Sequence, residues 1–290
     1  MKVNPFVTEL LRGEWLIHNP EAYYEYAENL RNKLDLNFDS KTKIHEKSLD
    51  ILDSYGNPLR SSDGNITVPA NSIARVEMRG EIVAYSDWCA IGADEIVANL
   101  FKAQEISNVD ATIFEIDSPG GSTKAIDPFR QFAKYKTKPV IGLVKDALSL
   151  GYWGAVEVCD YIMLNGDISS RVGSIGVVAS FRDNTKALEA LGVKIHEIYP
   201  PESNFKNKDY TDAKAGDYKG IIKNTLSPLA ISFQDSVKAN RPKLLLEDGV
   251  LNGGVYFAKE ALRLGLIDGV GDIRIAIAKA KELALVNAFK

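Results

Sequence analysis

Apolar and polar residues follow a different pattern in the first 65 residues than in the rest of the chain. The run EAYYEYAENLRNKL after Pro20 has apolar residues at helical spacing, and residues 54–65 are rich in Gly, Ser, Asp and Asn. This pattern predicts an N-terminal helical arm and a linker, which pack on their own domain or on a neighbouring subunit. We therefore expect two units, residues 1–65 and residues 66–290.

From Ile73 onward, strand-like and helix-like segments alternate. The predicted strands are IARVEMRGEIV, ATIFEID, PVIGLV, DYIMLN, SIGVVASF and VKIHEIY. The predicted helices are DEIVANLFKAQ, DNTKALEALG and residues 124–135, 149–159, 216–240 and 272–287. Alternation of this kind predicts an α/β fold around a largely parallel sheet.

Composition excludes several classes of protein. The 290 residues carry a net charge of −4 without a Lys/Arg block, so we expect no nucleic-acid partner. The sequence has no signal-peptide core and no stretch of about 20 apolar residues, which predicts a cytoplasmic protein without a membrane anchor. Cys89 and Cys159 form no Cys-x-x-Cys pair and no Cys/His cluster has zinc spacing, so we expect no metal or other cofactor.

Two segments that follow predicted strands combine glycine with serine. Asp117–Gly121, with the sequence DSPGG, forms either a plain strand-to-helix turn or a turn whose backbone N–H groups hold an oxyanion. Ser149, in the segment LSLGYW, stands where a strand meets a helix. It is either a helix N-cap or a nucleophile beside a helix N-terminus, and Gly151 lets another chain approach closely.

Two later segments add to this set. Val172–Val177, with the sequence VGSIGV, is either a structural turn or a close-packed turn near the same sheet edge. Ser203–Asp209, with the sequence SNFKNKD, is either a solvated loop or a source of a functional lysine.

In this order, the four segments resemble serine peptidase family S49, which includes signal peptide peptidase A and the phage head-maturation protease C. The closing stretch GVYFAKEALRLGLIDGVG is similar to the end of that family's domain. The resemblance extends from about Ile73 to Gly271 and leaves residues 1–65 outside. It implies a ClpP/crotonase-like α/β fold of repeated strand–helix units, preceded here by the N-terminal helical arm.

The resemblance also implies roles for individual residues. Ser149 would be the nucleophile, and the backbone N–H groups of Gly121 and Leu150 would form the oxyanion hole. Gly120 and Gly151 would contact the substrate. Leu150 stands where the bacterial enzymes usually carry glycine, a difference that would alter the pocket beside the oxyanion hole.

The general base implied by the resemblance is a lysine. The three histidines offer no well-placed triad, and a lysine acts as a base once burial lowers its pKa from about 10.4. Lys206 fits the short pattern of the phage-type members and is favoured. Lys208, followed by Asp209, resembles the bacterial pattern and is the alternative, and Ser174 is a candidate for orienting the lysine amine.

These features predict a serine endopeptidase with a Ser/Lys dyad. Without an anchor, it resembles a phage or prophage protease that digests scaffold or capsid proteins in the host cytoplasm or the assembling prohead, as a homo-oligomer. The alternatives are a cytoplasmic protease similar to signal peptide peptidase, a crotonase-like acyl-CoA enzyme, and an inactive assembly protein of the same fold.

Overall fold

The computed structural model describes residues 14–17, 49–59, 67–86, 91–181 and 183–289. The helix expected in EAYYEYAENLRNKL lies outside these residues. Two strands of the expected N-terminal unit are described, β1 (Glu14–Ile17) and β2 (Leu49–Leu52), and both pair with strands of the following unit. The first 65 residues therefore contribute to the sheets of the body.

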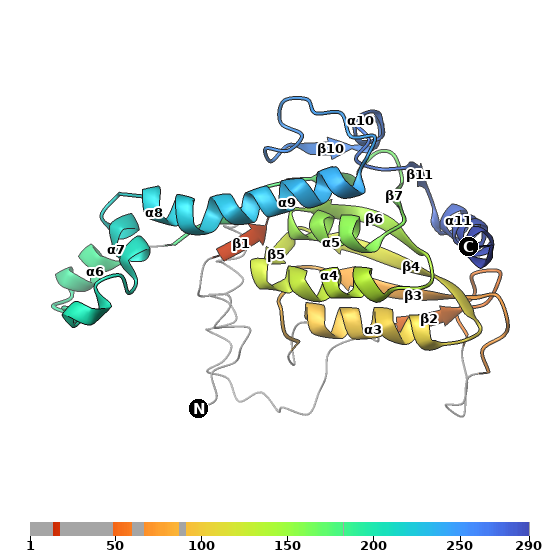
Figure 1. Ribbon diagram of the computed structural model, residues 1–290, viewed down its shortest axis with the longest axis horizontal. Coiled ribbons are helices and arrows are strands. Elements are labelled where there is room, and N and C mark those ends of the chain that lie inside the picture. Colours follow the sequence, from red (N-terminus) through yellow and green to blue (C-terminus); the bar gives the residue numbers. More distant parts are fainter. Residues whose placement is uncertain (1–13, 18–48, 60–66, 87–90, 182, 290) are drawn as a thin grey trace.

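The body is built on parallel strands (Figure 1). β3 (Ser72–Arg79), β4 (Val109–Ser118) and β6 (Val140–Leu148) run side by side in parallel. Beyond β6 the sheet divides, because the first half of β6 pairs with β7 (Tyr161–Asn165) and its end pairs with β8 (Arg171–Gly173). Both pairings are parallel, so the predicted α/β fold with a largely parallel sheet is confirmed.

The remaining strands lie at the margins of the sheet. β2 is antiparallel to β3, β10 (Val255–Phe257) is antiparallel to β8, and β11 (Gly269–Gly271) is parallel to β7. A separate small sheet has the order β5-β1-β9, in which β5 spans Gly120–Ser122 and β9 spans Val178–Ala179.

Helices cover both faces of the main sheet. On one face lie α3 (Ala93–Glu105), α4 (Ile126–Tyr135) after the short η1 (Thr123–Ala125), and α5 (Leu150–Val158) (Figure 1). Their apolar side chains form the larger core, which includes Phe114, Phe129, Phe132, Tyr152 and Trp153. On the other face α11 (Ile273–Ala288) covers a smaller core. The short α10 (Ala258–Arg263) follows β10.

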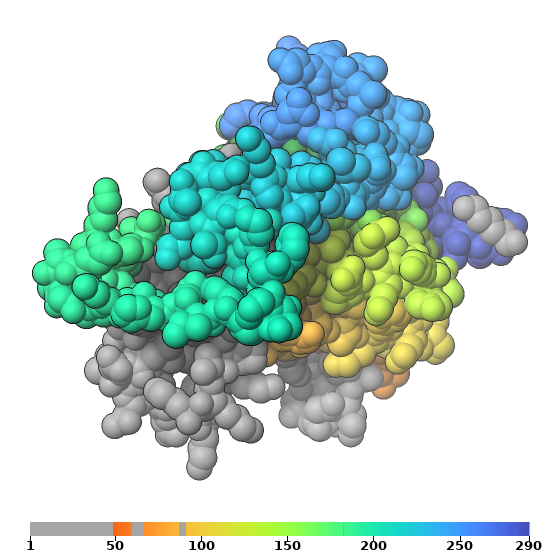
Figure 2. Space-filling view, turned by 60° about the vertical axis from the view of Figure 1, so that its left-hand side comes forward, coloured from red at the N-terminus to blue at the C-terminus, as the bar shows by residue number. Residues whose placement is uncertain are grey.

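Residues 183–226 form a projection that extends beyond the body (Figure 2). It contains α6 (Thr185–Ala190), η2 (Pro201–Ser203), α7 (Lys208–Lys214), α8 (Lys219–Ile221) and one π-helical turn, η3 (Ile222–Leu226). α8 and η3 continue directly into α9 (Ser227–Asn240), which returns to the body and packs on α5.

The strand predicted for VKIHEIY is wrong. Residues 193–199 have irregular backbone, and Ile195 and Ile198 are exposed. The apolar residues of this segment suggested a buried strand, but the segment lies in the projection, away from the sheet. Among the described residues, no helix is long and apolar enough to cross a membrane.

Candidate active site

Ser149 lies in the sharp turn between β6 and α5. Its backbone has φ 54° and ψ −120°, a left-handed conformation that costs a residue other than glycine about 1–3 kcal/mol. Its side chain accepts no hydrogen bond from the helix it precedes, so the N-cap interpretation fails. The Ser149 N–H donates to the Gly173 carbonyl at 2.9 Å, and Oγ lies 3.4 Å from the Gly176 carbonyl oxygen. A strained serine between a strand and a helix is the geometry that presents a nucleophile.

The SPGG turn connects β4 to β5, and the side chain of Ser118 stabilises it. Ser118 is fully buried, its hydroxyl donates to the Gly80 carbonyl at 2.6 Å, and its oxygen accepts from the Gly120 N–H at 3.1 Å. The sequence analysis gave no role to Ser118, although a serine that bonds the backbone two residues on is a known turn signal.

Gly151 brings the start of α5 against this turn. A Cβ at position 151 would lie 3.1 Å from the Ser118 carbonyl oxygen, which is tighter than most real contacts. The glycine therefore allows Ser149 and the SPGG turn to approach each other. Leu150, the first residue of α5, is fully buried, and its N–H has no intrahelical acceptor because it belongs to the first turn.

The backbone N–H and C=O of Gly121 face away from Ile82. The Gly120 carbonyl accepts from Ile82 N–H at 2.9 Å, and the Ser122 N–H donates to the Ile82 carbonyl at 2.8 Å. Successive residues of a strand direct their backbone groups to opposite edges, so the N–H of Gly121 faces the other edge of β5. A Cβ on Gly121 would overlap the Ile82 carbonyl, so only glycine fits here.

The VGSIGV segment lies on the other side of Ser149. Ser174 has φ 55°, and its N–H donates to the Gly254 carbonyl at 2.7 Å, which joins this turn to the segment before β10. Just before it, the Arg171 guanidinium donates to the Asp146 carboxylate, with Nε 3.1 Å from Oδ1. This ion pair links β8 to the end of β6, three residues before Ser149.

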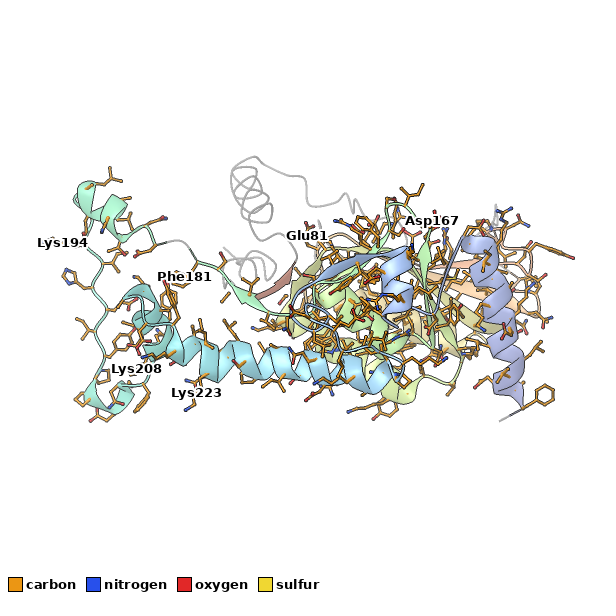
Figure 3. All side chains as sticks on the ribbon, turned by 90° about the horizontal axis from the view of Figure 1, so that it is seen from above. Glu81, Asp167, Phe181, Lys194, Lys208 and Lys223 are labelled. Carbon is orange, nitrogen blue, oxygen red and sulfur yellow. The ribbon has the colours of Figure 1, made fainter. Side chains whose placement is uncertain are left out.

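The two candidate lysines lie elsewhere, at the projection. Lys208 begins α7, far from the body in Figure 3, and residues 204–207 precede it directly. The Lys208 ammonium lies 2.8 Å from the Asp212 carboxylate, and this hydrogen bond raises the pKa of Lys208 above its usual value. The structure brings Ser149, Gly121, Leu150 and Ser174 together, but it does not bring either lysine to them within one chain.

Helix α5 is fixed by contacts on its buried side. The Tyr152 hydroxyl donates to the Leu266 carbonyl at 2.7 Å, and its burial raises the pKa of this phenol. The ring of Trp153 stacks on Phe233 of α9 with centroids 4.7 Å apart. The Ser236 hydroxyl, also on α9, lies 2.6 Å from Oε1 of Glu157. The helix that follows the serine is therefore packed and hydrogen-bonded against α9.

The described residues contain no group of three or more His, Cys, Asp or Glu side chains that could hold a metal ion. The site consists of a strained serine, a helix N-terminus and a glycine N–H directed outward from β5. These are the parts of a serine hydrolase site on an α/β fold. The chain belongs to peptidase family S49, whose model matches residues 133–287. The expected family is thus confirmed.

Curated relatives agree with this assignment. Protease 4 of Haemophilus influenzae is 28% identical over 237 residues, which cover 80% of this chain and 38% of the relative. The chloroplastic serine protease SPPA of Arabidopsis thaliana is 30% identical, over 67% of this chain and 29% of the relative. Capsid assembly protease C of Escherichia phage lambda is 26% identical, over 73% of this chain and 49% of the relative. The chain therefore spans between 29% and 49% of the length of these relatives.

Proposed function

We propose that this protein is a serine endopeptidase with Ser149 as its nucleophile. The observation that carries the proposal is the strained backbone of Ser149, placed between a helix N-terminus and the SPGG turn. A turn without a function would have no reason to keep serine in a conformation that favours glycine. Membership of a serine peptidase family supports the same chemistry.

The proposed reaction proceeds through an acyl-enzyme. A neutral lysine amine takes the proton of Ser149 Oγ while the oxygen attacks the scissile carbonyl. The N–H groups of Gly121 and Leu150 bind the oxyanion, each contributing about 3–4 kcal/mol to transition-state stabilisation. The amine product leaves with a proton from the lysine, and water then hydrolyses the ester. Ser174, half-buried beside Ser149, is proposed to orient the lysine amine, and Gly120 and Gly151 to contact the substrate.

We place the lysine of each site on a neighbouring copy of the chain. Lys206 and Lys208 lie on the projection, outside the body that holds Ser149 (Figure 3). Lys206 stays the favoured base, because Lys208 is paired with Asp212 and has a raised pKa, the opposite of what a base needs. A neighbour that buried this loop would supply the desolvation that lowers a lysine pKa.

The surface of the projection supports a homo-oligomer. Exposed apolar side chains that gather on one surface often mark a site of interaction with another molecule. The exposed apolar side chains of the projection are Leu191, Val193, Ile195, Ile198, Phe205, Tyr210, Tyr218 and Ile222. Contact with a second copy would cover these side chains and bring the lysine loop to a partner in the same step.

Active-site labelling tests the proposed activity directly. A fluorophosphonate probe should label the wild-type chain on Ser149, and Ser149→Ala should lose both the label and the hydrolysis of peptide substrates. Gly154→Ala, on the same helix, is the control that should keep both. Hydrolysis by Ser149→Ala at the wild-type rate would refute the proposal, and a crotonase-like enzyme would show no label at all.

For the biological role, we propose digestion of scaffold or capsid protein during phage head maturation. The similarity to capsid assembly protease C over 73% of this chain supports this role. Incubation with a candidate scaffold protein should give fragments with the wild-type chain and none with Ser149→Ala. Cleavage of signal peptides with no cleavage of scaffold would instead favour the function of a signal peptide peptidase.

A further inference from the structure

Strand β1 lies between the two segments that flank Ser149. Its residues pair antiparallel with β5, Trp15 opposite Ser122, Leu16 opposite Gly121 and Ile17 opposite Gly120. On its other side β1 pairs antiparallel with β9, Glu14 opposite Ala179 and Trp15 opposite Val178. β1 is thus the central strand of the small three-stranded sheet (Figure 1).

The register places β1 against the proposed oxyanion donor. The Gly120 carbonyl and the Ser122 N–H bond to Ile82, so the N–H and C=O of Gly121 face Leu16. The backbone of Leu16 therefore lies on the side of β5 where the proposed mechanism needs the carbonyl of a substrate.

The direction of β1 also fits a bound peptide. β1 runs from the Ser122 end of β5 toward Gly120, and so toward the SPGG turn that packs on α5. β9 begins two residues after Gly176, whose carbonyl lies beside Ser149 Oγ. Without β1, the edges of β5 and β9 would form a groove for an extended peptide, held by backbone pairing on both sides and leading to Ser149.

We propose that residues Glu14–Ile17 occupy the substrate groove of their own chain and must leave before another peptide binds. The inference rests on the proposed function, because the groove is defined by Ser149 and Gly121. It identifies the ligand of the groove as an extended peptide with its backbone in the register of β1.

The occupying strand reduces the apparent affinity for any other peptide. A tethered segment has an effective concentration in the millimolar range, and a free ligand binds only the fraction of molecules whose groove is open. The groove therefore binds another peptide weakly while β1 occupies it and tightly once β1 is displaced.

Peptide binding to full-length variants that carry Ser149→Ala tests this inference without any need for cleavage. The probe is a fluorescein-labelled peptide with the sequence RGEWLI of residues 12–17, followed by fluorescence anisotropy. Leu16→Pro removes the N–H that faces Gly121, and proline is not tolerated in a central strand. We expect the Leu16→Pro chain to bind the probe about tenfold more tightly, or better, than the Ser149→Ala chain alone.

Two further variants keep the test decisive. Replacing Trp15 and Leu16 together by glycine weakens the strand without adding a ring and should also tighten binding. Leu246→Pro, at an exposed leucine in the loop before β10, is the matched control and should leave the affinity unchanged. Equal affinity in all chains, or no binding by any of them, would overturn the inference. Tighter binding with no peptidase activity in a Leu16→Pro chain that keeps Ser149 would uphold it and refute the proposed function alone.

Discussion

Ser149 must combine a left-handed backbone, which favours glycine, with a hydroxyl group, which glycine lacks. Its position at the start of α5 places the hydroxyl between the Gly176 carbonyl and the SPGG turn, and this requires a left-handed backbone. Glycine would fit that backbone without strain, but glycine has no hydroxyl. The fold therefore accepts a loss of stability at this residue, as proteins commonly do where a reactive group must be presented.

This trade-off can be measured by comparing two inactive variants. Ser149→Gly and Ser149→Ala both lack the proposed nucleophile, but only glycine relieves the strain at φ 54°. We expect Ser149→Gly to have a free energy of unfolding about 1 kcal/mol higher than Ser149→Ala in urea titrations. A less stable glycine variant would show that the conformation carries no strain.

Gly121 leads to a second prediction at this scale. In Gly121→Ala the new methyl group overlaps the Ile82 carbonyl, so β5 must shift and the Gly121 N–H leaves the proposed oxyanion position. We expect kcat to fall by about 10²-fold or more, the loss seen when one oxyanion donor is removed. Gly154→Ala adds the same methyl group at an ordinary 3.6 Å from Phe129 and should keep kcat. Similar losses in both variants would contradict the assigned role of Gly121.

Among the elements, the contact between α5 and α9 connects the serine to the projection. The stacked rings of Trp153 and Phe233 form its centre, and both side chains are fully buried. Trp153→Ala should lower the free energy of unfolding by about 3–5 kcal/mol, because it opens a large cavity. Ile231→Ala, at an exposed position of α9, should change it by less than about 0.5 kcal/mol. Equal effects in thermal or urea unfolding would show that the contact does not anchor α9.

Sequence reasoning predicted the elements that depend on local pattern. β4, β6, α4 and α11 lie close to their predicted ranges, because each has a clear apolar period and a distinct end. The SPGG turn and the strand-to-helix serine were found because glycine and serine at such junctions have few other reasons to occur.

Features that depend on distant contacts were missed. β1 has four residues, and its partners lie more than 100 positions away along the chain, so no local period indicates it. The apolar residues of 193–199 predicted a strand, because a local pattern does not distinguish a strand of the sheet from an exposed apolar segment. The place of Lys206 relative to Ser149 depends on the direction of the projection, which no motif encodes.

At the scale of the whole molecule, the proposed dyad predicts complementation between inactive chains. Ser149→Ala and Lys206→Ala should each be inactive alone. When they are unfolded together and refolded as a 1:1 mixture, about a quarter of the sites should regain a serine from one copy and a lysine from its neighbour. Hydrolysis of a peptide substrate at about a quarter of the wild-type rate would show this.

The same experiment shows which of the two lysines, Lys206 or Lys208, acts as the base. If Lys208 were the base, Lys206→Ala would stay active alone, and Lys208→Ala would take its place in the complementation. A mixture that stays inactive, with both single variants dead, would place serine and lysine of each site in one chain.

The π-helical turn Ile222–Leu226 has a consequence for assembly. A π turn holds one residue more than an α turn, so each of its residues rotates the helix by less than the ~100° of an α-helical residue. Deleting Lys223 would therefore restore an α turn and leave the helix on either side close to its present phase. We expect the deleted chain to keep the number of copies measured by light scattering. The π turn thus absorbs one inserted residue, and in the proposed assembly each projection would keep the direction in which it meets a second copy.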